Sequence, residues 1–275
     1  MSDCKAIAVC NQKGGVGKTT TVLNLGVALA REGKRVLLID ADPQANLTMA
    51  LGVNYLEQLP ETTGSIMARV LLQEPIPPDG GVLHHEEGID LLPASPDLAG
   101  ISARLVSEPN RERVLRTYLK AVRPQYDYVL IDCMPSLEAI TLNAVSAADQ
   151  VLIPTQSQYF SGRALEQVIH TVRLVRQHIN PKLTIGGILV TMTRHTNMDR
   201  EMIAQIRGSY GSRIPVFHTE IPLSVRVAEA SAAGCSLFAY RPNDRVTLAH
   251  GQLAKEVINL AAKTRTQVRA EKSVR

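Results

Sequence analysis

A glycine-rich segment at residues 12–20 (QKGGVGKTT) constrains the fold of this chain more than any other feature. An apolar run at 5–11 precedes it, and a segment with helical apolar spacing at 19–31 follows it and ends before a glycine. A strand, a glycine loop and a helix in this order direct backbone N–H groups and the helix N-terminus at a phosphate. The segment therefore predicts an α/β fold with a phosphate site after the first strand.

Further apolar runs predict the rest of the sheet, at residues 35–40 (RVLLID), 128–132 (YVLID), 151–154 and 185–191 (IGGILVT). These runs are apolar throughout rather than alternating, which is typical of strands covered by helices on both faces. We expect such helices at 64–73, 165–178, 202–208 and 246–262, with a surface loop after the first of them. The predicted fold is α/β, a doubly wound and mainly parallel sheet with the ligand at the carboxyl ends of its strands.

The composition is that of a globular chain of 275 residues, with 45% hydrophobic and 20% charged residues. We expect residues 1–263 to form a single domain and residues 264–275 a basic, flexible tail, because the tail has almost no apolar face. No run reaches the ~18 to 20 apolar residues of a membrane span, and the N-terminus lacks a secretory pattern. The predicted location is the cytoplasm.

The four cysteines form no CxxC pair, which favours reduced, packed thiols. The formal charge of +4 and the isoelectric point near 8.9 are compatible with a local basic face but too mild to predict nucleic-acid binding alone.

The glycine-rich segment also predicts which of its residues contact the nucleotide and the metal ion. Lys18 is placed to reach the β and γ phosphates of a nucleotide, and the Thr19 hydroxyl is placed to bind Mg²⁺. The sequence thus predicts ATP and Mg²⁺ as cofactors. The predicted nucleotide-binding residues of the loop are Lys13, Gly14, Gly15, Val16, Gly17, Lys18, Thr19 and Thr20.

Two residues depart from the general phosphate-loop pattern: Gln12 stands where its first glycine is expected, and Lys13 adds a second lysine. The segment NQKGGVGKTT resembles the deviant Walker A P-loop of the ParA and MinD family. The resemblance implies that Lys13 reaches across a dimer interface to the partner's nucleotide. A cation inserted only in the dimer would make ATP hold two subunits together.

Two carboxylates follow the second apolar run, Asp40 and Asp42 in LLIDADPQANLT, at a strand end where ligands bind in such sheets. The resemblance assigns Asp42 to the attacking water and the Mg²⁺ shell, and Asp40 to support of the same loop. Lys13, Lys18 and Asp42 are the predicted catalytic residues.

A third carboxylate, Asp132, ends the run YDYVLIDCMPSL and indicates a Walker B element whose aspartate contacts magnesium through water. Thr19, Asp42 and Asp132 are therefore the predicted metal residues. Family members usually carry a second proline where this chain has Met134. Methionine has an N–H group and a freer φ, so we expect a looser loop here.

The resemblance covers nearly the whole chain, through GIDLLPASPDLAG, GILVTM and IPLSVRVAEASAAGCSLFAYRP, which look like ParA or Soj segments. The family's IPRNVR element reads IPLSVR here. Pro222 is carried over as a base contact, whereas Ser224 replaces an asparagine and shortens the side chain that could bond to the ring.

Relatives of this kind bind DNA without sequence preference as ATP-bound homodimers, associate with the nucleoid, and act in partition with a ParB-like partner that stimulates ATP hydrolysis. Arg226 matches an arginine of the IPRNVR element, and Arg194, His195 and Arg200 follow the GILVTM run. Arg194, Arg200 and Arg226 are the predicted DNA contacts, with Arg194 preferred over its neighbour His195.

Three alternatives are less compatible with the sequence. The first strand begins within a few residues of Met1, which leaves no room for a helix-turn-helix domain. A MinD-like membrane ATPase would need an amphipathic C-terminal helix with bulky apolar residues, and the tail offers two valines. An iron-sulfur or redox relative would need suitably placed cysteines.

Overall fold

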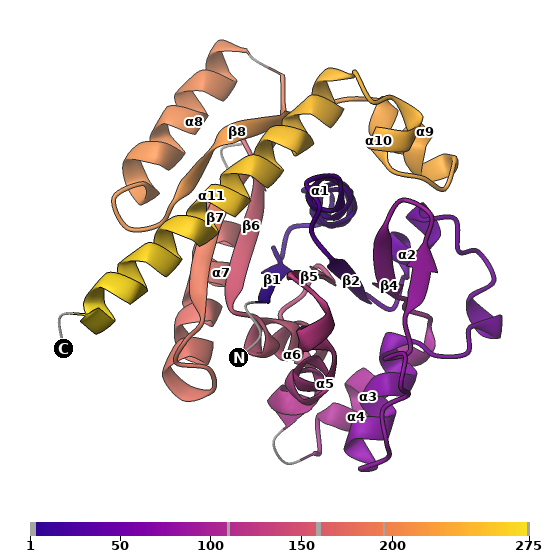
Figure 1. Cartoon of the computed structure of the whole chain (residues 1–275). Helices are drawn as coiled ribbons and strands as arrows, with labels where there is room; N and C mark the ends of the chain where they lie inside the picture. Colours follow the sequence, from indigo (N-terminus) through magenta and orange to yellow (C-terminus); the bar gives the residue numbers. More distant parts are fainter. Residues whose placement is uncertain (1–3, 109–110, 158–160, 195, 274–275) are drawn as a thin grey trace.

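The computed structural model describes residues 4–108, 111–157, 161–194 and 196–273, which form an eight-stranded sheet covered by helices. The strand order across the sheet is β3-β4-β2-β5-β1-β6-β7-β8 (Figure 1). Neighbouring strands are parallel, except that β3 runs antiparallel to β4 at one edge. The predicted doubly wound, mainly parallel sheet is confirmed.

The strands are Lys5–Val9 (β1), Val36–Ala41 (β2), Leu83–His85 (β3), Ile89–Leu92 (β4), Tyr128–Cys133 (β5), Gln150–Gln156 (β6), Thr184–Thr193 (β7) and Val216–Pro222 (β8). The α-helices are Lys18–Arg31 (α1), Asn46–Ala50 (α2), Thr63–Leu71 (α3), Asp97–Leu105 (α4), Val114–Val122 (α5), Ala139–Ala147 (α6), Ser161–His178 (α7), Asn197–Tyr210 (α8), Arg226–Ala232 (α9), Leu237–Tyr240 (α10) and Arg245–Ser273 (α11). Short 3₁₀ turns lie at Leu56–Gln58, Arg111–Arg113 and Arg123–Gln125.

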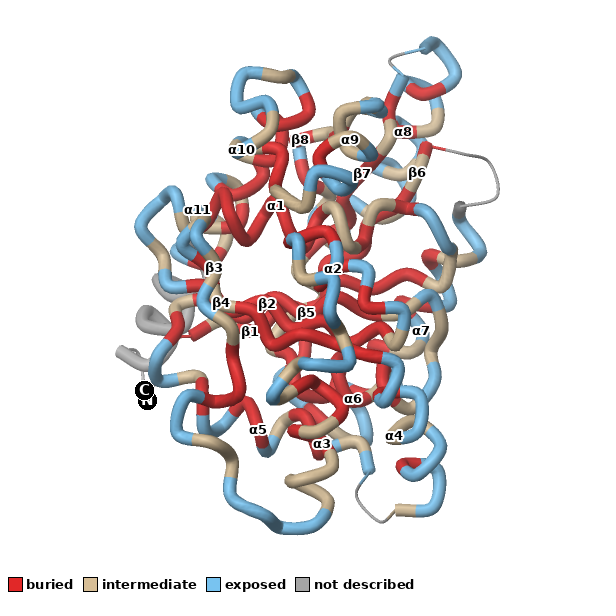
Figure 2. The backbone as a smooth tube through the Cα atoms, turned by 90° about the vertical axis from the view of Figure 1, so that its right-hand side faces the viewer, coloured by how far each residue is buried: buried red, intermediate tan, exposed pale blue. Residues whose placement is uncertain are grey.

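The core consists of two apolar clusters, one on each face of the sheet. Helices α3 to α8 cover one face, and α1, α10 and α11 cover the other. Successive residues of β1 alternate between them, with Ala6 and Ala8 in one cluster and Ile7 and Val9 in the other. Figure 2 shows the buried backbone concentrated in the strands and the exposed backbone around them. Because both faces are covered, the central strands β1, β2 and β5 are buried at nearly every position and mostly apolar, as the sequence indicates.

The strand β1 lies between β5 and β6, so the chain leaves it first toward β2 on one side and later toward β6 on the other. Such a reversal of direction opens a crevice beyond the carboxyl ends of the strands, where open α/β sheets bind ligands. The glycine-rich loop that joins β1 to α1 emerges at this point.

Three helices extend several residues beyond their predicted bounds. Helix α7 begins at Ser161 rather than at 165. Helix α8 begins at Asn197 rather than at 202, because Thr196 and Asp199 form a reciprocal capping box that starts the helix earlier. The closing helix α11 continues past the predicted end at 262 to Ser273. Most of the residues from 263 to 273 are good helix formers, and no glycine or proline ends the helix among them. The side chains from residue 263 on lie outside the described part of the chain, so the division at 263 and the flexible tail stay predictions.

Two strand regions were not predicted. The hairpin β3–β4 lies in a segment rich in histidine and glutamate, and only its second strand is largely buried. Strand β8 is an edge strand whose residues alternate between buried and exposed, so it lacks the continuous apolar run of the central strands. The two edge strands, β3 and β8, and the strand β4 next to one edge therefore escaped the pattern that found the centre of the sheet.

Candidate nucleotide site

The loop between β1 and α1 has the backbone shape of a phosphate cradle. Gly15 and Gly17 adopt positive φ angles of 67° and 83°, which side chains disfavour. Gly17 is the N-cap of α1, and no side chain caps the helix there. The N–H groups of the first helical turn are therefore available to an anion, which the helix dipole also attracts.

Three side chains that are not among the predicted site residues form hydrogen bonds that hold this loop in place. The Asn11 amide donates to the Pro154 carbonyl at 2.8 Å and accepts from the Lys13 N–H at 3.0 Å. The Thr191 hydroxyl donates to the Val16 carbonyl at 2.9 Å. The Gln156 amide donates to the Gly15 carbonyl at 2.9 Å. The ends of β6 and β7 thus fix the shape of the loop.

The two lysines of the loop lie close to each other. The Lys18 ammonium donates to the Lys13 carbonyl oxygen at 3.3 Å, and Lys18 is only 7% exposed. Burial lowers the pKa of Lys18, and the nearby Asp132 carboxyl opposes this shift in part. The Lys13 ammonium donates to the Gln156 side-chain oxygen at 3.1 Å. Lys18 therefore lines the cradle, whereas the Lys13 ammonium is held by Gln156 at the end of β6.

Asp132 is buried at the end of β5, and neither of its carboxylate oxygens has a hydrogen-bond partner within the described residues. Burial and the neighbouring Asp40 charge raise the pKa of Asp132 well above its usual range, while nearby Thr19 and Lys18 lower it in part. A buried carboxylate without partners is costly unless a cation or an ordered water completes it. This side chain therefore fits a site for Mg²⁺ beside Thr19.

Asp40 has a different environment, although it ends the adjacent strand β2. Its oxygens accept from the Asp42 N–H at 3.2 Å and from the Thr48 N–H and hydroxyl at 2.9 and 2.7 Å. Burial raises the pKa of Asp40 to about 6, and the bonds from Thr48 oppose this rise. Asp40 thus joins β2 to α2 and supports the loop, which is the role that the family resemblance implies.

A cavity of about 640 Å³ lies against the glycine loop. Asp42 lines it together with Lys18 and Thr19, and one Asp42 oxygen accepts from the Gln44 N–H at 2.9 Å. The other lining residues are Gly14, Gly15, Gly17, Thr20, Asn46, Met49, Ala50, Asn54, Pro135, Met192, Ser231 and Ala232. The structure therefore brings six of the eight predicted loop residues and Asp42 to one cavity, whereas Lys13, Val16 and Asp132 do not line it. Helices α2 and α9 add walls that the sequence did not predict.

A second, mostly apolar cavity of about 220 Å³ adjoins the first and shares Gly17, Thr20 and Met192 with it. Pro222 and Ser224 line this cavity. The predicted base contact thus lies within reach of the loop, beyond Thr20. Met192 lies between the two cavities in a left-handed conformation (φ 56°), which is uncommon for a residue other than glycine.

The predicted DNA contacts all follow the carboxyl ends of β7 and β8. Arg194 comes directly after β7 and is exposed, and Arg200 is exposed in the first turn of α8. Arg226 opens α9 and pairs with Glu229 at 2.7 Å. Because β7 and β8 are parallel, these arginines lie at the carboxyl ends of the strands, as the glycine loop does. His195 lies outside the described residues.

None of the four cysteines, all of which lie in the described part of the chain, forms a disulfide, and Cys4, Cys10 and Cys133 are buried. Burial raises the pKa of Cys10 to about 12, so this thiol stays protonated. No helix in the described part of the chain is long and apolar enough to span a bilayer.

Fold and loop together place the chain among the P-loop nucleotide-binding proteins. Residues 4–185 match a family model described as an AAA domain. The chain is 41% identical over 254 residues to the sporulation initiation inhibitor protein Soj of Bacillus subtilis, which covers 92% of this chain and 98% of that protein. It is also 41% identical to the chromosome partitioning protein ParA of Caulobacter vibrioides, over 93% of this chain and 94% of that one. The chain therefore belongs to the ParA/Soj family of P-loop ATPases.

Solved structures share this fold. Cobyrinic acid a,c-diamide synthase from Mycobacterium smegmatis, with bound ADP and magnesium, superposes with a TM-score of 0.79 at 34% identity. The match covers 93% of this chain and 94% of that one.

Proposed function

We propose that this protein is a partition ATPase that binds ATP with Mg²⁺, dimerises around the bound nucleotide and holds DNA without sequence preference. Hydrolysis then dissolves the dimer. The similarity to Soj and ParA over nearly the whole chain supports this function. The single observation that carries it is the second lysine, Lys13, in the glycine loop, where its carbonyl oxygen accepts from the Lys18 ammonium.

The glycine loop would bind the phosphates through its N–H groups, with Lys18 against the β and γ phosphates and Thr20 toward the sugar side. Pro222 would contact the base in the adjoining apolar cavity. The lining of this cavity is mostly apolar. Most of the proposed affinity for the nucleotide therefore comes from contacts with the phosphates.

Thr19, Asp42 and Asp132 would hold Mg²⁺, whose charge neutralises the phosphates and offsets their repulsion of the carboxylates. The unpartnered oxygens of Asp132 support this assignment. Asp42, at the wall of the cavity, would orient the attacking water.

Lys13 would act across the dimer interface. Within its own subunit its ammonium contacts Gln156, so insertion into the partner's site would exchange this contact for phosphate oxygens. Such a cation would favour the dimer only while the terminal phosphate is present, because a ligand shifts an equilibrium only by its differential affinity.

Arg194, Arg200 and Arg226 would meet DNA phosphates in the dimer. We propose that the protein is cytoplasmic, associates with the nucleoid in its ATP form, and is stimulated by DNA and a ParB-like partner.

Sedimentation velocity with a non-hydrolysable ATP analogue and Mg²⁺, compared with ADP, tests the proposal. The wild type should become a dimer only with the analogue. Lys13→Ala should bind the analogue yet stay monomeric, whereas Lys120→Ala, an exposed lysine on α5, should behave as the wild type. A wild type that stays monomeric at high concentration would refute the proposal. DNA retention should depend on ATP in a parallel assay. ATP-dependent binding to liposomes instead would favour a membrane-associated positioning ATPase.

A further inference from the structure

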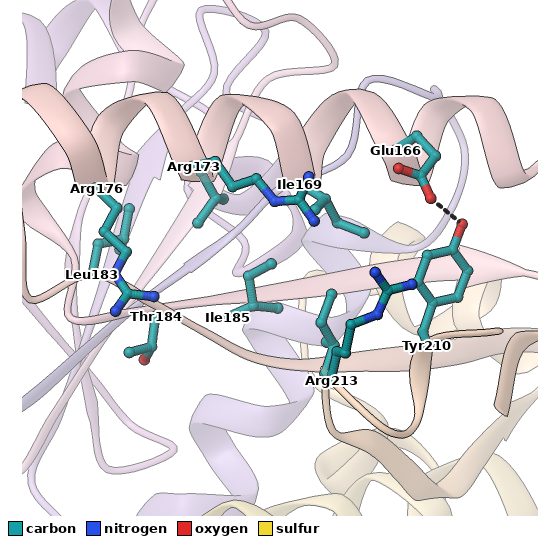
Figure 3. A pocket seen from close by; sticks show the side chains of 11 residues that line it. Glu166, Ile169, Arg173, Arg176, Leu183, Thr184, Ile185, Tyr210 and Arg213 are labelled. Carbon is teal, nitrogen blue, oxygen red and sulfur yellow. Dashed lines mark hydrogen bonds between the residues drawn. The ribbon is translucent and has the colours of Figure 1, made fainter. Parts of the chain in front are cut away.

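A third cavity, of about 450 Å³, lies far from the glycine loop in a cleft between helix α7 and the end of α8 (Figure 3). Its walls come from α7, from the first residues of β7 and from the turn that joins α8 to β8. We call it the α7–α8 cleft. It is lined by Glu166, Ile169, Val172, Arg173, Arg176, Leu183, Thr184, Ile185, Tyr210, Arg213 and Ile214.

The floor of the cleft is apolar. Ile169, Val172 and Leu183 are buried members of the core on this face of the sheet. Ile185 and Ile214 are only partly buried and complete the floor. An apolar surface that remains partly accessible at the bottom of a cleft suits an apolar side chain of a ligand.

The rim of the cleft is basic. Arg173 and Arg176 lie one turn apart on α7, and Arg213 lies across the cleft from them (Figure 3). All three are exposed, and none forms an ion pair with a carboxylate among the described residues. Arg213 makes one long contact, from its guanidinium to the Ser209 carbonyl at 3.5 Å.

The one carboxylate at the rim is already engaged. The Tyr210 hydroxyl donates to Glu166 at 2.7 Å and closes one end of the cleft (Figure 3). Burial and this bond raise the pKa of Tyr210 to about 12, so the hydroxyl keeps its proton. Three guanidinium groups against one occupied carboxylate leave a local excess of positive charge.

We propose that the α7–α8 cleft docks an acidic segment of a protein partner, which places an apolar side chain on the floor and carboxylates against Arg173, Arg176 and Arg213. The planar guanidinium fork matches a carboxylate with two parallel hydrogen bonds. Arginine and tyrosine around an apolar centre is also the composition enriched at protein interfaces.

Two other ligands fit the cleft less well. A small metabolite site needs several fixed polar groups for orientation, whereas this cleft offers exposed arginines and one exposed threonine, Thr184. Duplex DNA presents a convex row of phosphates and would leave the apolar floor unfilled.

The cleft is separate from the nucleotide site, and the proposal does not depend on the proposed function. Thr184 at the cleft and Met192 at the glycine loop lie on the same strand, β7, eight residues apart and hence roughly 26 Å at ~3.3 Å per residue. The two sites therefore lie at opposite ends of strand β7. The acidic segment should accordingly bind with or without nucleotide.

Fluorescence anisotropy with a labelled peptide of two Glu-Leu-Glu triplets joined by Gly-Ser tests the proposal on the full chain. The same peptide with glutamine in place of glutamate is the matched probe. The double variant Arg173→Ala/Arg213→Ala should bind the acidic peptide at least tenfold more weakly than the wild type. Arg163→Ala is the control, because Arg163 is exposed on the same helix but does not line the cleft.

The acidic peptide should bind the wild type and the control equally, and the glutamine peptide should bind neither. The proposal is overturned if the wild type does not bind the acidic peptide, if the glutamine peptide binds as well, or if the double variant keeps the wild-type affinity. A phosphate ligand would replace the proposed acidic segment if the wild type binds no peptide and the double variant loses the DNA retention that the wild type shows.

Discussion

Two buried carboxylates end neighbouring parallel strands, and their surroundings separate their roles. Asp40 is fully satisfied by Thr48 and by the backbone of Asp42, so it can only support the loop. Asp132 has no partner within the described residues and faces the cradle beside Thr19 and Lys18. Chemistry is expected at the unsatisfied group, because an unpaired buried charge needs a cation.

Asp42→Ala should separate dimerisation from turnover. The loop and Lys13 would still grip the phosphates, so the ATP-dependent dimer should persist. Loss of the group that orients the attacking water should lower the turnover rate by about 10²–10⁴. Phosphate release and sedimentation on the same sample measure both quantities, with Glu32→Ala at the exposed end of α1 as the control. Turnover near the wild-type rate would remove Asp42 from the catalytic set.

His250 on α11 makes stability depend on pH. It is fully buried, neither ring nitrogen has a partner within the described residues, and burial lowers its pKa from 6.5 to about 3. The unfolded chain takes up a proton below pH ~6.5 while the folded chain does not, so the free energy of unfolding falls as the pH drops. At pH 5 this loss is about 2 kcal/mol relative to pH 7.5.

Urea unfolding of the wild type and of His250→Leu at both pH values measures this effect. The variant should lose about 2 kcal/mol less between pH 7.5 and pH 5 than the wild type, whatever its absolute stability. His170→Leu, which replaces an exposed histidine on α7, should keep the wild-type difference. Equal pH dependence in the wild type and His250→Leu would show that His250 titrates in the folded chain as it does in the unfolded one.

At the scale of elements, two glycines fix how α2 and α9 approach each other. Gly52 follows α2 and Gly234 follows α9, and both have positive φ angles. A Cβ at Gly234 would lie 2.8 Å from the Gly52 Cα atom, so no side chain fits between them. Both helices line the cavity at the glycine loop, so this contact shapes the cavity wall.

Gly234→Ala should therefore lower the free energy of unfolding by about 2 kcal/mol, from backbone overlap and the left-handed conformation. Gly208→Ala is the matched control, because Gly208 lies within α8 and a Cβ there meets nothing within 4 Å. This control should gain about 0.5–1 kcal/mol, as alanine does over glycine in a helix. Denaturant unfolding compares the two, and equal effects would contradict the close contact.

Sequence patterns predicted those strands and helices that a local signal marks, such as an apolar run or a capping residue. The strands β1, β2, β5, β6 and β7 were predicted because each is a continuous apolar run. The start of α8 was missed although Thr196 and Asp199 have the spacing of a capping box, a signal that could have located it. The edge strands carry mixed residues, and their pairing depends on neighbours distant in sequence.

At the scale of the whole molecule, Arg226→Ala should weaken binding of the ATP-bound protein to unrelated DNA sequences about equally. The slope of log affinity against log salt should fall by ~1, because one phosphate contact is lost. The ion pair of Arg226 with Glu229 is more than a third exposed on both sides, so a DNA phosphate can compete for the guanidinium. Arg104→Ala on α4, where another exposed arginine pairs with Glu108, is the control for DNA titrations at several salt concentrations. An unchanged slope would remove Arg226 from the DNA-binding face.

The sequence by itself determined the phosphate cradle, because a glycine loop between a strand and a helix is built from consecutive residues. It also determined the central strands, which local composition marks. Only the tertiary structure decided which residues complete the site. Asn11 contacts Pro154, and Lys13 contacts Gln156, each across 143 residues of sequence. Arg173 and Arg213 line the same cleft only because α7 and α8 cover the same face of the sheet. Contacts of this kind are fixed by how elements pack, which no local pattern encodes.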